Sequence, residues 1–331
     1  MTLAIGDVVL KNRAILSPMA GITDLPFRRL AARFGAGLTI SEMVASGELL
    51  SRGAAAKAKA EIDLAADVSA VQIAGRDAAP MAEAARIAED AGARLIDINM
   101  GCPAKKVTSG WSGAALMREP AHAIRLIEAV IGAVGVPVTL KMRLGWDESA
   151  ITAPDLARRA AAAGVAMVTI HGRTRAQFYK GRADWAAVAA VREAIDIPLV
   201  VNGDIIDLAS ARRALELSGA DAVMIGRGAE GAPWTPGVIG AALAGDAPPQ
   251  IPSGGALTEL IIEHYEAMLD FYGVALGLRV ARKHLGWWLA RIPGAEPLRA
   301  DLMRMTAPAS VIAALRDWES PGEAPLARRA A

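Results

Sequence analysis

Short runs rich in valine, isoleucine and leucine recur through the first two-thirds of this chain of 331 residues. They follow one another at intervals of about 30 residues, which is the length of one strand with its helix and connections. Each run ends near a glycine, proline, asparagine or aspartate and precedes a longer, alanine-rich stretch of helical periodicity. Eight such runs predict an α/β fold, a (β/α)8 TIM barrel whose parallel strands are covered by helices. The predicted strands begin at Ala14, Leu38, Ala70, Leu95, Val138, Met167, Leu199 and Ala222.

A doubly wound open sheet is the alternative arrangement of alternating strands and helices. It is disfavoured because no GxGxxG motif follows the first run. The repeat ends near Gly240, and residues 245–255, GDAPPQIPSGG, form a break rich in proline and glycine. Helical periodicity resumes after this break. The sequence thus predicts a barrel over residues 1–244, a linker over 245–255 and a small C-terminal α-helical domain over 256–331, with PGEAPLARRAA as a frayed tail.

The composition, with 53% apolar and 21% charged residues, is typical of a folded globular protein. No apolar run approaches the roughly 18 residues that a membrane span needs, and the N-terminus lacks the basic and apolar segments of a secretory signal. A single cysteine excludes an internal disulfide and suits a reducing compartment, so we expect a cytoplasmic protein. A net charge of +1 gives no global basic field of the kind that a dedicated nucleic-acid binder has.

Polar and glycine-rich motifs follow seven of the eight predicted strands. In a barrel, the C-terminal ends of the strands form the active site. We therefore expect polar groups from at least five strands to converge on one mouth. The motifs are SPMAG at 17–21, QIAG at 72–75, NMGCP at 99–103, LKMR at 140–143, HGRTR at 171–175, NGD at 202–204 and IGRG at 225–228.

Three of these motifs carry chemistry of their own. Gly203 and Gly226, with Arg227, follow the last two strands, where barrels commonly bind phosphate through backbone N–H groups. Either glycine alone could merely turn the chain, but together they indicate a phosphorylated cofactor. Lys141 lies inside an apolar run and needs a partner, either as a Schiff base or beside the anionic edge of a reduced flavin. His171 could bind a metal, but without paired acidic ligands no metal site is expected.

The same motifs, in this order and at these distances, closely resemble those of the tRNA-dihydrouridine synthases. RKHLGWW at 282–288 further resembles the B-type bacterial branch. The resemblance covers nearly the whole chain. It implies an oxidoreductase that binds FMN in the barrel and uses NADPH to reduce the C5–C6 double bond of particular uridines in tRNA, in the D-loop region. By similarity, the FMN-binding residues are Pro18, Met19 and Ala20 at the isoalloxazine face, Gln72 and Lys141 at its polar edge, and His171, Asn202, Gly203, Asp204, Gly226 and Arg227 at the ribityl chain and phosphate.

Cys102, in the stretch DINMGCPAKK at 97–106, is the only cysteine. A lone free cysteine is most often a small, inert core residue. The resemblance instead makes it a proton donor: hydride passes from N5 of the flavin to C6 of the uracil, and Cys102 delivers a proton to C5 from the opposite face. A thiol is mostly protonated at neutral pH, so it can act as this acid. By similarity, Asn99 orients the uracil.

A uridine must be extruded from the folded tRNA before it can reach the interior of a barrel. Lysines and arginines at the mouth and on the helical domain are candidates for the surface that cradles the tRNA. Trp111, in GWSG at 110–113, departs from the family pattern, and the sequence assigns it no role. The predicted substrate-binding residues are Asn99, Lys105, Lys106, Arg143, Arg173, Arg175, Arg282 and Lys283.

Two other functions are compatible with parts of this pattern. A flavin-dependent reductase of free pyrimidines or enoyl compounds, similar to a dihydroorotate dehydrogenase, would share the FMN site but would need no helical RNA-binding domain. A flavin-free tRNA-binding module would keep the fold, with Cys102 serving only in packing. The residues after Gly255 disfavour the first, and Cys102, Lys141 and His171 disfavour the second. We expect a monomer, since the family generally acts as one.

Overall fold

The computed structural model describes residues 2–51, 53–63 and 68–318. The chain divides into two compact units, one of residues 1–229 with 234–249 and one of residues 230–233 with 250–331. The boundary after residue 249 lies within the predicted linker. In its described part the first unit is α/β, and the second consists of helices. The predicted frayed tail, PGEAPLARRAA, lies outside the described residues.

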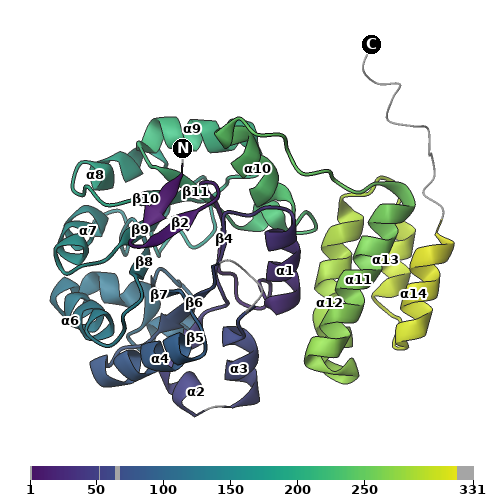
Figure 1. The fold of residues 1–331 in the computed structure, drawn as a ribbon, viewed down its shortest axis with the longest axis horizontal. Coiled ribbons are helices and arrows are strands. Elements are labelled where there is room, and N and C mark those ends of the chain that lie inside the picture. The colour runs from purple at the N-terminus through teal and green to yellow at the C-terminus, as the bar shows by residue number, and fades with distance from the viewer. Residues whose placement is uncertain (1, 52, 64–67, 319–331) are drawn as a thin grey trace. The chain divides into compact units, whose positions relative to one another are not determined.

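The sheet of the first unit is parallel throughout, in the order β4-β3-β11-β10-β9-β8-β7-β6-β5 (Figure 1). β4 and β5 lie on either side of a bend, where the second predicted strand leaves β3 and joins β6. A parallel bridge between Ile40 and Ala70 joins the two edges, and the Ser41 N–H donates to the Ala70 carbonyl at 2.9 Å. The sheet therefore closes, and the predicted fold, a (β/α)8 barrel followed by helices, is confirmed. The strands are β3 (Ala14–Leu16), β4 (Leu38–Thr39), β5 (Val44–Ala45), β6 (Ala70–Ala74), β7 (Leu95–Met100), β8 (Val138–Arg143), β9 (Met167–His171), β10 (Leu199–Asn202) and β11 (Ala222–Ile225).

Helices surround these strands in the first unit (Figure 1). Many of their inward positions are alanines, such as Ala84 and Ala85 of α4, which are fully buried. The local signals are clearest in α9. The Asp207 carboxylate caps its start by accepting from the Ser210 N–H at 2.7 Å, and Gly219 ends it with a φ of 64°. The helices are α1 (Leu25–Arg33), α2 (Ser46–Leu50), α3 (Ala54–Ala60), α4 (Ala78–Asp90), α5 (Lys105–Thr108), α6 (Pro120–Ile131), α7 (Ala153–Ala162), α8 (Ala189–Arg192), α9 (Leu208–Ser218) and α10 (Thr235–Ala244), with short 3-10 turns η1 (Gly113–Arg118), η2 (Ala186–Val188) and η3 (Arg227–Ala229).

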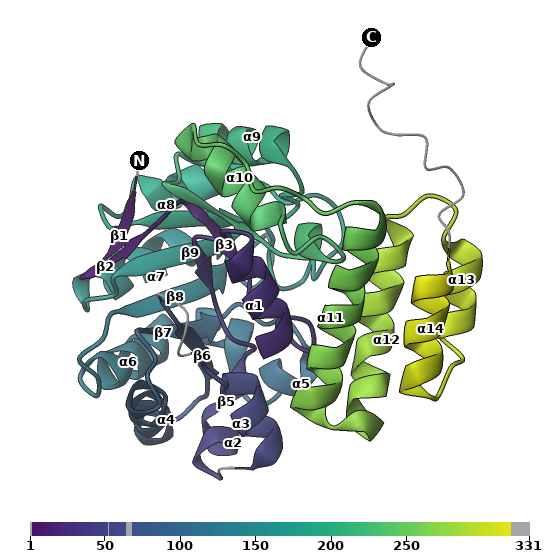
Figure 2. The same cartoon turned by 45° about the vertical axis from the view of Figure 1, so that its right-hand side comes forward.

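A hairpin absent from the sequence prediction precedes the barrel. Its strands β1 (Leu3–Ile5) and β2 (Val8–Leu10) pair antiparallel across a turn in which Gly6 has a φ of 61°. Alternate side chains of the hairpin are buried, and they pack on the first residues of several barrel strands, including Leu38 and Leu95. Figure 2 shows the hairpin at one end of the strands. Because it covers the amino ends of the strands, the open mouth is at their carboxyl ends.

The second unit contains the helices α11 (Gly254–Tyr272), α12 (Val274–Ala290), α13 (Glu296–Leu302) and α14 (Pro308–Asp317). Gly273, with a φ of 74°, joins α11 to α12. His264 of α11 and His284 of α12 are both buried, with ring centroids 5.0 Å apart, and the Trp288 Nε1–H donates to His264 Nδ1 at 3.1 Å. None of the helices in the described part of either unit is long and apolar enough to cross a bilayer.

Candidate active site at the carboxyl ends of the barrel strands

Strand register sets the predicted site residues of neighbouring strands side by side. Asn99 of β7 pairs with Lys141 of β8, and Arg143 of β8 pairs with His171 of β9. His171 in turn pairs with Asn202 of β10. All five residues lie near the carboxyl ends of parallel strands, so these polar side chains converge at one mouth of the barrel.

The loop that carries Cys102 is held from two sides. Asn99 Oδ1 accepts from the backbone N–H groups of Gly101 and Cys102 at 3.1 and 2.9 Å. From the other side, the Ala114 N–H donates to the Cys102 carbonyl at 3.1 Å. Gly113 has a φ of 59°, and a Cβ there would lie 2.9 Å from the Cys102 carbonyl oxygen. These contacts fix the backbone on which the half-buried thiol stands.

A chain of buried side chains reaches from Asp97 to this loop. The Gln72 Nε2 donates to Asp97 Oδ2 at 2.6 Å, and the Asn99 Nδ2 donates to Gln72 Oε1 at 2.9 Å. The Thr139 hydroxyl donates to Asp97 Oδ1 at 2.6 Å. Because Asp97 Oδ2 accepts from the Gln72 nitrogen, the Gln72 oxygen is turned to Asn99. That in turn aims the Asn99 oxygen at the Cys102 loop, so Asp97 sets the direction of the whole chain.

Asp97 is a site residue that the sequence analysis missed, although a carboxylate within the apolar run LIDIN was a visible signal. Burial raises its pKa, while the hydrogen bonds from Thr139 and Gln72 and the charge of Lys141 act in the opposite direction. Gln72 and Asn99 were predicted to contact flavin and uracil. The amide nitrogens of Gln72 and Asn99 each use one hydrogen in the bonds described above. The second hydrogen of each nitrogen can be donated to a ligand.

Lys141 is buried, as its position inside an apolar run requires. Its Nζ donates to Asn202 Oδ1 at 3.1 Å, and the Asn202 Nδ2 donates to the Met224 carbonyl at 2.8 Å. Loss of hydration lowers the pKa of Lys141 to about 8, and the charge of Arg143 adds to this effect. An ammonium can donate three hydrogen bonds, so Lys141 is suited to bind an anionic or carbonyl edge of a ligand.

His171 belongs to a cluster of charged groups at the ends of β9, β10 and β11. The Arg173 guanidinium lies 3.3 Å from His171 Nε2 and donates to Asp204 Oδ2 at 2.6 Å, while Arg227 donates to Asp204 Oδ1 at 3.3 Å. Burial, followed by the charges of Lys141 and the neighbouring arginines, lowers the pKa of His171 well below its usual value. The imidazole is therefore neutral at pH 7, and because Arg173 can only donate, His171 Nε2 accepts and Nδ1 carries the hydrogen.

Close backbone approach explains the glycine that precedes Asp204. A Cβ on Gly203, which has a φ of 113°, would lie 2.8 Å from His171 Cδ2. Asp204 itself has a left-handed φ of 55°. Burial acts to raise the pKa of Asp204, but hydrogen bonds from Arg173 and from the backbone, together with the charges of Arg173 and Arg227, lower it overall. The site thus presents ionised guanidinium groups around one carboxylate.

These residues fit a phosphorylated, anionic cofactor. The charges of Lys141, Arg143, Arg173 and Arg227 all act on His171, so positive charge is concentrated at this mouth. Gly226 leaves room beside the SPMAG segment, since a Cβ there would make only ordinary contact, 3.5 Å from Met19 Sδ. Met19 therefore lies beside Gly226, and Pro18, Met19 and Ala20 are half-buried or exposed after β3.

Two arginines predicted to cradle tRNA are instead buried. Arg143 is 2% exposed and donates to the carbonyl of Gly101 at 2.8 Å and to carbonyls of the loop 174–178. Arg173 is 1% exposed and donates to carbonyls of residues 180–181. Neither guanidinium faces solvent, so the expected surface role is corrected: the two side chains hold the loops that follow β7 and β9.

The other predicted tRNA contacts divide between the two units. Lys105 and Lys106 are exposed on α5, directly after the Cys102 turn, and Arg175 is half-buried in the loop after β9. Arg282 and Lys283 are half-buried on α12 of the second unit. Among the residues with described positions, no group of three or more His, Cys, Asp or Glu side chains is arranged to hold a metal ion.

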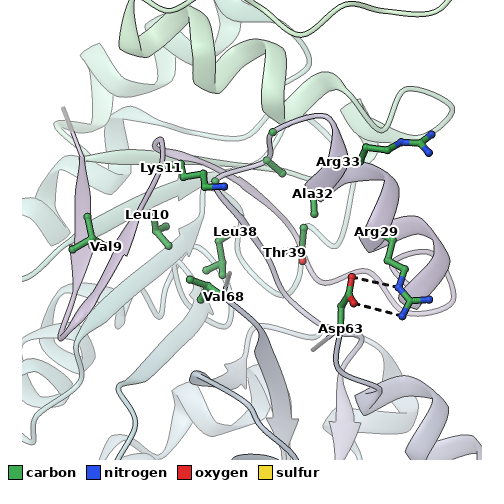
Figure 3. Close-up of a pocket in the computed structure, with 13 residues that line it drawn as sticks. Val9, Leu10, Lys11, Arg29, Ala32, Arg33, Leu38, Thr39, Asp63 and Val68 are labelled. Carbon is green, nitrogen blue, oxygen red and sulfur yellow. Dashed lines mark hydrogen bonds and ion pairs between the residues drawn. The ribbon is translucent and has the colours of Figure 1, made fainter. Parts of the chain in front are cut away.

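A separate pocket of about 540 Å³ lies near the amino ends of the strands (Figure 3). Its lining comes from β2, α1 and the segment that leads into β4, and an ion pair of 3.3 Å joins Arg29 to Asp63 at its edge. It includes none of the predicted site residues. The candidate active site remains the mouth at the carboxyl ends of the strands, where the polar side chains converge. The pocket is lined by Val9, Leu10, Lys11, Arg29, Ala32, Arg33, Gly35, Ala36, Gly37, Leu38, Thr39, Asp63 and Val68.

Solved structures of several enzymes have a similar fold. The old yellow enzyme homologue from Zymomonas mobilis superimposes with a TM-score of 0.53 at 17% identity, over 77% of this chain and 94% of that one. Morphinone reductase gives a TM-score of 0.51 at 16% identity, over 75% of this chain and 91% of that one. At such identities these likenesses support the barrel fold alone.

Sequence comparison identifies much nearer relatives. A probable tRNA-dihydrouridine synthase of Rhodobacter capsulatus is 61% identical over 98% of this chain and 100% of its own length. The tRNA-dihydrouridine synthase B of Xanthomonas campestris pv. campestris is 45% identical over 95% of each chain. The family model described as dihydrouridine synthase (Dus) matches residues 15–320. The resemblance drawn from the strand-end motifs is thereby confirmed, and the chain belongs to the dihydrouridine synthase family.

Proposed function

We propose that this protein reduces particular uridines of tRNA to 5,6-dihydrouridine, with FMN as its bound cofactor and NADPH as the reductant. The observation that carries the proposal is the family match across the barrel, combined with a cysteine loop fixed beside the buried cations Lys141 and Arg143. The relatives' names supply the tRNA substrate. Such a substrate agrees with the cytoplasmic location expected from the single cysteine.

The residues proposed to hold FMN are those that converge at the mouth. Lys141 and Gln72 would meet the polar edge of the ring system, where a buried ammonium can offset negative charge. The glycines after β10 and β11 would allow backbone N–H groups to approach the phosphate. The full proposed set is Pro18, Met19, Ala20, Gln72, Lys141, His171, Asn202, Gly203, Asp204, Gly226 and Arg227.

In the proposed reaction, bound FMN supplies the hydride that is added to C6 of the uracil. Cys102 then transfers the proton of its Sγ to C5, which completes the saturation of the C5–C6 bond. The thiolate that remains is near the positive charges of Lys141 and Arg143, since both interact electrostatically with Cys102. The thiolate takes up a proton again before the next turnover. Asn99 contributes by fixing the backbone of Cys102 and by offering its second amide hydrogen to the uracil.

The target uridine, which we propose lies in the D-loop region, must leave its stack to reach Cys102. Lys105 and Lys106, exposed on α5 beside the cysteine turn, are suited to contact the phosphates around it. Arg282 and Lys283 of the helical unit are proposed to contact another part of the tRNA. The protein is proposed to act as a monomer.

The test uses tRNA from cells that lack dihydrouridine, incubated with the protein and NADPH, with the modified nucleosides mapped by mass spectrometry. Wild-type protein is expected to add two hydrogens at defined uridines. Cys102→Ala is expected to bind flavin and oxidise NADPH while its uridine reduction falls roughly a hundredfold, because general acid catalysis is worth at least that much. Cys102→Ser is the matched control for packing, since it keeps the size but is a far weaker acid, and it should resemble Cys102→Ala.

The alternatives give different results in the same assay. Wild-type protein that oxidises NADPH but leaves tRNA unmodified would favour a reductase of free pyrimidines, which can then be offered as substrates. Purified protein that stays colourless with added FMN would favour a flavin-free tRNA-binding module. Full activity of Cys102→Ala would exclude the thiol as the proton donor.

A further inference from the structure

The loop that carries Cys102 also carries an exposed tryptophan on strained backbone. Trp111 is 51% exposed, and its φ of 57° lies in the left-handed region, which bulky side chains rarely adopt. Such backbone conformations cost free energy and persist where the surrounding structure enforces them, often at functional sites. Half of the surface of this large apolar residue is exposed to solvent, so its burial does not compensate for the backbone strain.

Trp111 is tied directly to the cysteine turn. The Trp111 N–H donates to the Thr108 carbonyl at 3.1 Å, at the end of α5. Two residues later Gly113 packs on Cys102, and the next residue, Ala114, donates its N–H to the Cys102 carbonyl. The tryptophan therefore lies on the segment that contacts the backbone of the proposed proton donor.

Arginines stack with this ring and with a second tryptophan. The Arg118 guanidinium lies 5.8 Å from the ring centroid of Trp111 and 4.9 Å from that of Trp146. The Arg175 guanidinium lies 4.5 Å from the Trp146 centroid. These four residues, which we call the tryptophan–arginine rim, come from the loops after β7, β8 and β9. Backbone hydrogen bonds join two of these loops, with the Ala176 N–H donating to the Trp146 carbonyl at 2.8 Å.

The side chains of the tryptophan–arginine rim indicate which kind of ligand it would bind. Aromatic faces interleaved with arginines and lysines bind unpaired bases by stacking and phosphates by charge. Arg118, Lys105 and Lys106 are exposed within seven residues of Trp111, and the charge of Arg118 also acts on Asp147, next to Trp146. The rim thus combines exposed cations with aromatic faces. A polyanion with accessible bases complements this combination better than an apolar protein surface does.

We infer that Trp111 stacks on an unpaired nucleobase of the tRNA adjacent to the extruded uridine. The inference rests on the proposed function. When a uridine leaves its stack, the neighbouring base loses a stacking partner, and the indole ring beside Cys102 replaces it. Arg118, held between the two tryptophans, fixes the orientation of the ring and adds positive charge for the adjoining phosphate.

The decisive variant is Trp111→Gly. Glycine adopts a φ of 57° without strain, so this change removes the ring and relieves the backbone together. The expected result is a melting temperature no lower than that of the wild type, and a KM for dihydrouridine-free tRNA that rises on the order of tenfold, the loss of one base–aromatic stack. A merely structural role for Trp111 predicts a lower melting temperature instead.

Two conservative variants separate stacking from simple apolar contact. Trp111→Phe keeps an aromatic face and should hold KM within a few fold of the wild type, whereas Trp111→Leu keeps apolar bulk and should resemble Trp111→Gly. Val9→Ala, at an exposed aliphatic residue of the hairpin, is the control expected to match the wild type in both measurements.

The outcomes distinguish this inference from the function on which it rests. An unchanged KM in Trp111→Gly, or equal KM values for Trp111→Phe and Trp111→Leu, would overturn the stacking role while the wild type still reduces tRNA. Wild-type protein that reduces no uridine in tRNA overturns the proposed function, and the inference with it, before any variant is measured.

Discussion

Asp97 contacts neither the thiol nor its backbone in the bonds described above, yet it determines how the Cys102 loop is held. Its carboxylate forces one orientation on Gln72, and Gln72 forces one on Asn99. The Asn99 oxygen is thereby directed to the backbone N–H groups of Gly101 and Cys102, from which it accepts. At the scale of single residues, Asp97 is a positioning residue for the proposed proton transfer.

Substitutions at Asp97 test this role. Asp97→Leu leaves the buried Gln72 nitrogen without its acceptor, which should cost about 1–3 kcal/mol of stability and slow uridine reduction roughly ten- to a hundredfold through misplacement of the donor. Asp97→Asn is the matched control, since its oxygen can still face Gln72 while its nitrogen faces the Thr139 oxygen, and it should retain most of the activity. The measurement is kcat for tRNA, beside urea unfolding. Equal kcat values for the two variants would contradict the positioning role.

Residues at strand ends were predictable because their chemistry is visible in the sequence. Lys141 stands out as a cation in an apolar run, and it is buried as expected. The burial of Arg143 and Arg173 was not predictable in this way. Arg143 donates to carbonyls of loops that follow other strands, and Arg173 donates to carbonyls seven and eight residues further along its own loop. A sequence does not reveal which carbonyls a loop will turn toward a guanidinium.

At the scale of elements, the repeat of strand and helix was predictable because each barrel strand is short, apolar and followed by a turn signal. The split of the second strand into β4 and β5 was not, because it depends on the bend that lets Ile40 bridge to Ala70 and close the barrel. The hairpin carried a local signal, alternating residues around Gly6-Asp7. What it covers became evident only from the assembled strand ends.

The paired helices α11 and α12 enclose two neutral histidines, and this predicts sensitivity to acid. Burial lowers the pKa of His264 to about 3, and burial followed by the charges of His264 and Lys283 lowers that of His284 well below its usual value. Above pH 6.5 both are neutral whether folded or unfolded, so stability is unaffected. As pH falls from 6.5 toward 3, these histidines become protonated in the unfolded chain but stay neutral in the folded protein. The free energy of unfolding therefore falls by up to about 1.4 kcal/mol per pH unit for each histidine.

Urea unfolding at pH 7.5, 6 and 5, followed by the circular dichroism of the helices, measures this loss. His264→Gln provides the control, since glutamine can accept from the Trp288 Nε1–H but does not titrate in this range. Its unfolding free energy should fall less steeply with acid than that of the wild type. The same pH slope in both proteins would rule out His264 as the source.

At the scale of the whole molecule, a net charge of +1 means that no global field attracts a polyanion. Binding of tRNA must depend on local cations, and its affinity should fall steeply as salt is added, with a slope of about 0.7–0.9 in log K per log salt for each phosphate contacted. Filter binding of tRNA to Lys105→Ala/Lys106→Ala should give a shallower slope than the wild type. Trp111→Gly should weaken binding without changing the slope, because a stacked base releases no counterions. An unchanged slope in the double lysine variant would exclude these lysines from phosphate contact.

The hairpin that covers the amino ends of the strands imposes an order on biosynthesis. It leaves the ribosome before any strand of the barrel, yet its buried face packs on Ala222 and Met224 as well as on earlier strands. β3 cannot pair with β11 until Val223 has been made. At usual translation rates this takes roughly 10–45 s. Throughout that time the aliphatic side chains of the hairpin lack part of their packing partners. The growing chain therefore exposes them to chaperones until the last strand of the barrel is complete.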